Sequence, residues 1–112
     1  MATKERRVGP AGLLKTGSSW LDDKASFTTD DPGLEQAAVM LWSISAAIRA
    51  RQGQLRLSVT ALADKSGVRR QTVTDVTMGT TWPDAATLAR ICSTLGLEIT
   101  AVSNFESVNT ND

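Results

Sequence analysis

The sequence has no histidine and only one cysteine among its 112 residues. Most zinc sites and most nucleophilic dyads depend on these two side chains, so neither a metal centre nor a His-based catalytic site is expected. One cysteine also excludes a disulfide within the chain. No stretch approaches the roughly 18 apolar residues of a membrane-spanning helix, and no long apolar run follows the basic N-terminal residues. We therefore expect a cytoplasmic protein that is not an enzyme, needs no cofactor and has no membrane partner.

The formal net charge is zero, but the charges are unevenly distributed. Residues 34–96 contain seven basic and four acidic residues, a net of +3. Residues 1–33 are balanced, and residues 97–112 carry three acidic residues and no basic one. A basic central region with neutral or acidic ends is a weak indication of a nucleic-acid-binding domain.

Residues 57–79 predict two short helices joined by a tight corner. Ser58 is expected to cap the first helix with its hydroxyl, Gly67 to end it, and a second helix to run from about Arg70. Helices of this length are not stable alone, so they must pack on neighbours. The residues expected to face inward are Leu62, Ala63, Val68, Val73 and Val76. The residues left on the outer face of the second helix are Arg70, Gln71, Thr74 and Asp75.

A longer helix is predicted before this pair and a shorter one after it. Asp31 and Pro32 suit the start of the first, which is expected to end near Gly53. Its apolar face carries Leu34, Ala38, Leu41, Ile44 and Ile48. Val39, Met40 and Trp42 lie beside that face, so a second contact surface is expected, covered either by residues 1–30 or by a sister subunit. In the later helix, capped by Asp84, the inward residues are Leu88, Ile91, Cys92 and Leu95, with Cys92 as a small hydrophobe.

Residues 97–102 alternate strictly and are rich in β-branched side chains, which predicts a strand. A lone strand in a helical domain has no partner within the chain. Its natural partner is the same strand of a second copy across a two-fold axis. The dimerisation residues would be Leu97, Ile99, Ala101 and Val102. Residues 104–112 are polar and acidic and are expected to be a disordered tail.

Eight landmarks between residues 57 and 96 resemble the Cro/C1 (XRE) type helix-turn-helix family: Leu57-Ser58, Leu62-Ala63, Gly67-Val68, Val73, Gly79, Pro83, Leu88 and Leu95-Gly96. The resemblance covers roughly residues 34–96. It implies a mainly α fold: a five-helix domain over residues 31–103, with the short C-terminal strand pairing across a dimer. A weaker resemblance, to antitoxins of the HipB type, rests on the helices followed by that strand.

The resemblance implies a dimeric, sequence-specific DNA-binding regulator that represses a palindromic operator. The alternative is a HipB-like antitoxin that neutralises a partner toxin and autoregulates its operon. In either case the outer helix face would enter the major groove, where Arg70 pairs with guanine and Gln71 with adenine. Asp75 could accept from cytosine, although phosphates repel it. The full DNA-contacting set expected is Ser58, Val59, Arg69, Arg70, Gln71, Thr72, Thr74, Asp75, Thr80 and Thr81.

Two departures from the family pattern affect how the domain would dock. Val59 stands where the family has a Gln that binds the DNA backbone, and Arg69 stands where a capping Ser or Thr is common. We expect the long Arg69 cation to replace the missing phosphate anchor. In the family, the end of the preceding helix lies near the DNA backbone, so Arg49 and Arg51 are either phosphate contacts or a solvated face.

Residues 1–30 predict an N-terminal arm, because glycines and serines interrupt any periodicity. Trp20, Leu21 and Phe27 are nevertheless costly to leave in water. Three interpretations stay open. The arm could lie loosely on the domain or on a dimer partner, it could dock on another protein such as a toxin, or its basic residues could reach a minor groove.

Overall fold

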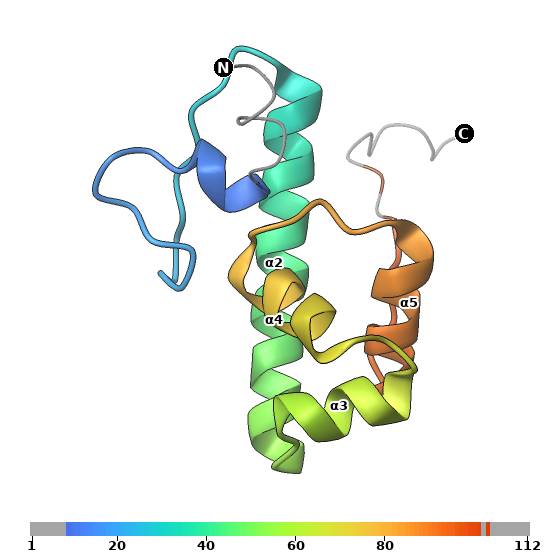
Figure 1. Cartoon of the computed structure of the whole chain (residues 1–112). Helices are drawn as coiled ribbons and strands as arrows, with labels where there is room; N and C mark the ends of the chain where they lie inside the picture. The colour runs from blue at the N-terminus through green and yellow to red at the C-terminus, as the bar shows by residue number, and fades with distance from the viewer. Residues whose placement is uncertain (1–8, 102, 104–112) are drawn as a thin grey trace.

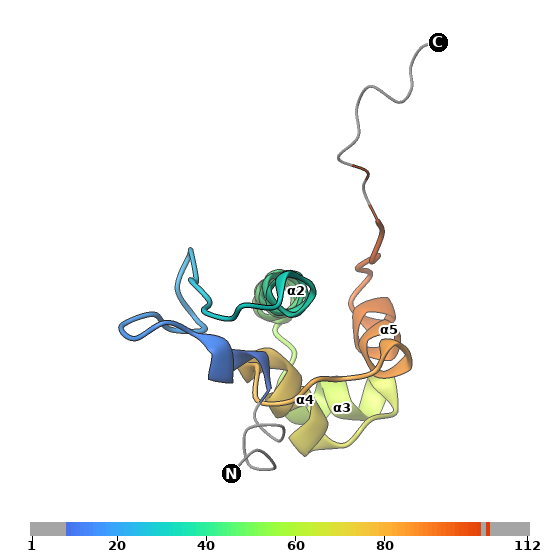
Figure 2. The same ribbon diagram turned by 90° about the horizontal axis from the view of Figure 1, so that it is seen from above.

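Four α-helices form the body of the protein in the computed structural model, which describes residues 9–101 and 103. They are α2 (Pro32–Leu55), α3 (Val59–Ser66), α4 (Arg70–Met78) and α5 (Ala85–Thr94), preceded by the 3-10 helix η1 (Pro10–Leu13). The long helix α2 forms one side, α3 crosses near its C-terminal end, and α4 packs between them (Figure 1). Seen along α2, helix α5 lies on the side of the molecule opposite residues 9–30 (Figure 2). A five-helix domain was expected, but the described residues contain only four α-helices.

Local capping chemistry places the helix ends close to where the sequence predicts them. The Asp31 carboxylate accepts from the backbone N–H groups of Gly33 and Leu34. The Ser58 hydroxyl accepts from Ala61 N at 3.0 Å, and Asp84 accepts from Thr87 N at 2.7 Å. These bonds satisfy amide groups that have no partner within their own helix. Helix α2 runs two residues past the expected end at Gly53, and its C-cap, Arg56, has a left-handed backbone with φ of 55°.

A single hydrophobic core joins the four helices. It is built from Ala38, Leu41, Ile48, Leu62, Ala63, Val73, Val76, Leu88, Ile91, Cys92 and Leu95. The inward faces expected for α3, α4 and α5 are therefore confirmed. Leu34 is the exception on α2, where 36% of its surface remains exposed. Leu34 lies in the first turn of α2, and that end of α2 is the one farther from α3 (Figure 1).

Residues 9–31, the N-terminal segment, add two aromatic side chains to this core. Trp20 is 4% exposed and Phe27 7%, and their rings meet edge to face with centroids 6.1 Å apart. Gly9 N–H donates to Thr80 O at 3.2 Å and Ala11 N–H to Gly79 O at 2.8 Å. The segment is thus bonded to the backbone that follows α4. Residues 1–8 of the expected arm lie outside the described residues.

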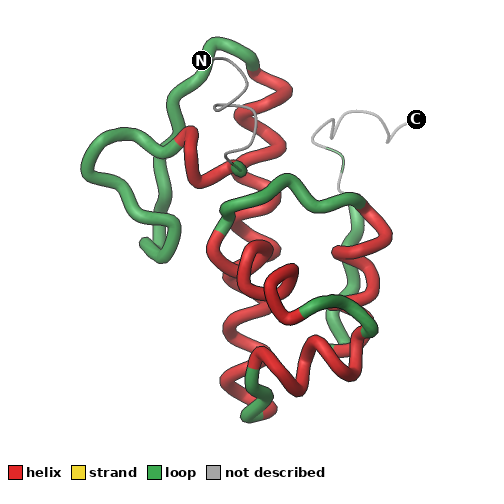
Figure 3. The backbone as a smooth tube through the Cα atoms, in the orientation of Figure 1, coloured by secondary structure: helices red, strands yellow, loops and turns green. Residues whose placement is uncertain are grey.

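The chain from Leu97 to Ala101 is not assigned to a strand, and none is drawn among the described residues (Figure 3). Leu97 N–H donates to Cys92 O at 2.8 Å. Within the described chain, no backbone hydrogen bond is formed by residues 98–101. Val102, expected in the strand, and the tail expected at 104–112 lie outside the described residues.

Candidate nucleic-acid interface

The outer face of α4 carries a row of exposed polar side chains. Arg69, Arg70, Gln71 and Thr74 are all exposed, whereas Val73 and Val76 on the opposite face are buried. Arg69 is the N-cap residue of α4, makes no side-chain capping bond and is exposed. Two positive charges and one amide therefore stand at the N-terminal turn of α4, where they can reach phosphates and base edges.

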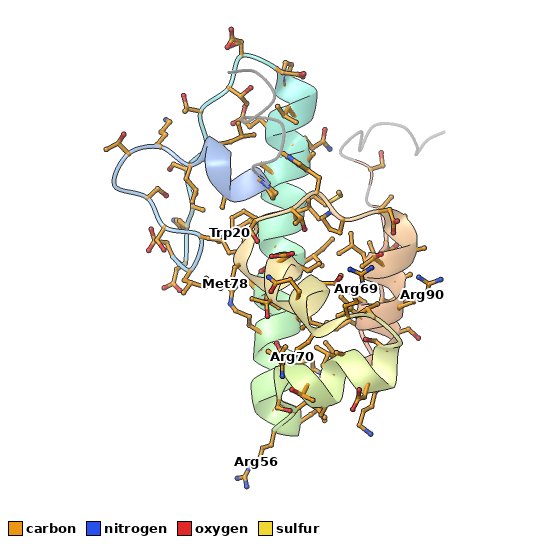
Figure 4. All side chains as sticks on the ribbon, in the orientation of Figure 1. Trp20, Arg56, Arg69, Arg70, Met78 and Arg90 are labelled. Carbon is orange, nitrogen blue, oxygen red and sulfur yellow. The ribbon has the colours of Figure 1, made fainter. Side chains whose placement is uncertain are left out.

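Helix α3 contributes to the same face through its own N-terminus. Arg70 Nη1 donates to Thr60 Oγ1 at 3.5 Å, so the Arg70 side chain reaches from the start of α4 to the first turn of α3 (Figure 4). Ser58 uses its oxygen to cap α3 and keeps its hydroxyl proton as a donor. Val59 is half-buried and packs against the core. Thr60 was not predicted from the sequence, although its place two residues after the cap could have identified it.

The side chains of Gln71 and Thr80 are both hydrogen-bonded to Asp75. Gln71 Nε2 donates to Asp75 Oδ1 at 3.0 Å. Thr80 Oγ1 donates to the same carboxylate oxygen at 2.9 Å. The Thr80 hydroxyl, expected to donate to phosphate, is thus already used within the fold. Of the other expected contact residues, Thr72 and Thr81 are half-buried, and Thr74 Oγ1 donates back to Arg70 O at 3.3 Å.

A buried polar cluster holds the C-terminal end of α4. The Ser45 hydroxyl is fully buried and donates to Thr77 O at 2.7 Å. It accepts from Trp20 Nε1 at 3.0 Å and from Arg49 Nη1 at 2.6 Å. Arg49 Nη1 also donates to Thr77 O at 2.8 Å. The last carbonyls of a helix have no partner within it and carry partial negative charge, so a cation here both completes their bonding and complements the helix dipole.

Arg51 plays the equivalent part for α5. Its Nε donates to Leu95 O at 3.0 Å, at the C-cap of that helix, and its Nη1 donates to Gln54 Oε1 at 2.9 Å. Burial lowers the pKa of Arg49 from its ordinary value, consistent with a guanidinium directed into the fold. Both arginines considered for phosphate contact are therefore engaged with the ends of other helices. Arg56, by contrast, points away from the domain beyond the last turn of α2 (Figure 4).

Comparison with protein families matches residues 48–102 to a helix-turn-helix family model. Residues 48–102 are a helix-turn-helix domain of the Cro/C1 (XRE) type. In a helix-turn-helix domain the second helix of the pair lies in the major groove, and here that helix is α4. The match identifies a DNA-binding regulator and confirms the family predicted from the sequence. Comparisons with curated proteins and with solved structures give no match.

The described residues show few other features suited to catalysis or metal binding. Cys92 is 3% exposed, and burial raises the pKa of its thiol. No cluster of three or more His, Cys, Asp or Glu side chains in the described part of the chain could hold a metal ion. None of the helices described is both long enough and apolar enough to span a membrane.

Proposed function

We propose that the protein is a sequence-specific, dimeric transcriptional repressor that binds a palindromic operator. The observation that carries this proposal is the outer face of α4, where Arg70 and Gln71 are exposed at the N-terminal turn. Arg can pair bidentately with guanine and Gln with adenine. Arg69, Ser58 and Thr60 would contact phosphates and so fix the position of α4 along the DNA. Promoter DNA bound by the dimer would then be inaccessible to the transcription machinery.

Dimerisation is proposed through residues 97–102 of two copies. In support, the backbone of residues 98–101 has no hydrogen-bond partner within the described chain, and Ile99 is 47% exposed. A groove of about 320 Å³ runs beside this segment, lined by Met40 and Ile44 of α2 and by Leu97 and Ile99. An antiparallel pair of such segments would satisfy both backbones and cover apolar surface. The two α4 helices would then enter major grooves about one helical turn apart, roughly 34–36 Å.

The antitoxin alternative drew part of its support from the aromatic side chains of the N-terminal residues, as a docking surface for a toxin. Trp20 and Phe27 are both buried in this chain's own core. They are not accessible to a toxin unless the segment detaches. We therefore favour the repressor, which needs no such rearrangement.

The test is fluorescence anisotropy with DNA from upstream of the protein's own gene and with a scrambled duplex of equal length. Gln71→Ala should weaken binding to the upstream duplex by about 1–3 kcal/mol and leave the scrambled duplex nearly unaffected. Gln36→Ala is the matched control, because Gln36 is an exposed glutamine near the start of α2. Equal losses on both duplexes would reassign Gln71 to backbone contact or folding. Equal, salt-sensitive binding of the wild type to both would refute sequence-specific recognition of this site.

A further inference from the structure

The carboxylate of Asp75 accepts hydrogen bonds from two side chains. Gln71 Nε2 approaches from one turn earlier on α4, at 3.0 Å, and Thr80 Oγ1 from the loop after α4, at 2.9 Å. Both meet the same oxygen, Oδ1. Asp75 is half-buried, whereas Gln71 and Thr80 are exposed.

This bond decides which way the Gln71 amide faces. A carboxylate only accepts hydrogen bonds, so the amide must present its nitrogen to Asp75. The second N–H of that nitrogen and the carbonyl oxygen Oε1 are left to the outside. One donor beside one acceptor is the pair that matches N7 and N6 of adenine in the major groove. A glutamine without such an anchor can turn its amide over and present the opposite pattern.

Thr80 is itself held in place by the N-terminal segment. Its backbone N–H donates to Asp75 O at 3.0 Å, and its carbonyl accepts from Gly9 N–H at 3.2 Å. Gly9 lies so close that a Cβ there would sit 2.3 Å from Thr81 N and 2.5 Å from the Thr80 carbonyl carbon. On the other side, Trp20 packs directly on Gly79. The loop that carries the Thr80 hydroxyl thus has little room to move.

We propose that Asp75 and Thr80 are positioning residues that fix the amide of Gln71 for adenine, and that Asp75 itself reads no base. This inference rests on the proposed function of α4 as the base-reading helix. It assigns to the N-terminal segment a part in sequence recognition, through Gly9, Thr80 and Asp75 in turn. It also avoids using a carboxylate, which phosphates repel, as a base-reading group, because the Asp75 carboxylate accepts from two donors of its own chain.

The test measures discrimination at each base pair rather than overall affinity. The probe is the duplex that the wild-type protein selects most strongly from a randomised library, with every base pair changed in turn. Gln71→Ala should relax discrimination at one base pair by roughly five- to 150-fold. Asp75→Ala should relax discrimination at that same pair. The double variant should lose no more than Gln71→Ala alone, because both changes remove one interaction.

Conservative variants separate positioning from folding and from charge. Asp75→Asn keeps an oxygen that can accept both bonds, and Thr80→Ser keeps the hydroxyl, so both should retain wild-type discrimination. Thr80→Val removes the hydroxyl at nearly constant shape and should partly relax discrimination at the base pair that Gln71 contacts. If Asp75→Ala relaxes a different base pair, or weakens all duplexes by one factor, the proposal is overturned.

NMR of the free protein provides a readout that does not depend on DNA. The side-chain amide nitrogen of Gln71 should show an ordered N–H group by heteronuclear NOE, and this NOE should fall in Asp75→Ala. If this order is seen but the wild type discriminates no sequence, the proposed function fails and positioning for base reading fails with it. If the wild type discriminates and Asp75→Ala leaves both its base profile and the Gln71 NOE unchanged, the positioning proposal alone fails.

Discussion

Replacing Trp20 tests whether the N-terminal segment is part of the folded domain. Trp20 is 4% exposed, meets Phe27 edge to face, lies on Gly79 and donates to Ser45. Truncating a buried tryptophan to alanine typically costs about 3–5 kcal/mol, through the lost burial of apolar atoms and the cavity left behind. A domain of ordinary stability has about 5–15 kcal/mol in total. We therefore expect Trp20→Ala to remove a large share of the free energy of unfolding.

The hydrogen bond to Ser45 is a smaller part of that loss. When the indole N–H is removed, the Ser45 hydroxyl still donates to Thr77 O and still accepts from Arg49. No buried polar group is left without a partner, so the bond itself is worth about 0.5–1.5 kcal/mol. Trp20→Phe, which keeps most of the apolar volume, should therefore cost about 1–2 kcal/mol.

Urea unfolding followed by far-UV circular dichroism measures these differences. Leu21→Ala is the matched control, since Leu21 is the next residue and is 53% exposed. It should stay within about 0.5 kcal/mol of wild type. If Trp20→Ala unfolds at the same urea concentration as Leu21→Ala, the segment is not part of the cooperative fold and the reasoning fails.

Three further predictions concern backbone strain, pH and assembly. Gly67 and Gly79 both have positive φ, 74° and 72°, but a Cβ at Gly67 meets nothing within 4 Å while one at Gly79 lies 2.5 Å from the Trp20 ring. In thermal melts Gly67→Ala should lower the free energy of unfolding by about 1–2 kcal/mol, and Gly79→Ala should lower it by about 1–3 kcal/mol more. Equal losses in the two variants would contradict the close contact between Gly79 and Trp20. A hydrogen bond from the Thr87 backbone lowers the pKa of Asp84, so its stabilisation is complete above about pH 4 and is lost as pH falls through the lowered pKa. Asp84→Asn should flatten that acid-side decline in unfolding experiments, and an unchanged decline would rule the cap out as its source. Finally, Ile99→Pro removes a backbone N–H that has no partner in the described chain and should give a monomer by sedimentation, whereas Ile99→Val should stay dimeric; a dimeric proline variant would refute strand pairing.

The helices of the domain were predictable from the sequence because their ends depend on near neighbours. Asp31, Ser58 and Asp84 each bond to a backbone N–H two or three residues further along. The inward positions of α3, α4 and α5 follow in the same way from the spacing of apolar residues on a helix. Arg70 and Gln71 are not among the inward apolar positions of α4 and therefore face outward. The central residues of the candidate interface were thus also predictable.

Other assignments depended on contacts between distant parts of the chain. Nothing near Arg49 in the sequence indicates that it meets Thr77 O, 28 residues away, or that Arg51 meets Leu95 O, 44 residues away. The burial of Trp20 on Ser45 and Gly79 likewise needs α2 and α4 to be packed first. Short-range capping and periodicity thus determined the helices and their outer faces. Only the tertiary structure decided which arginines hold helix ends and that the N-terminal segment completes the core, because those energies arise only after distant groups have been brought together.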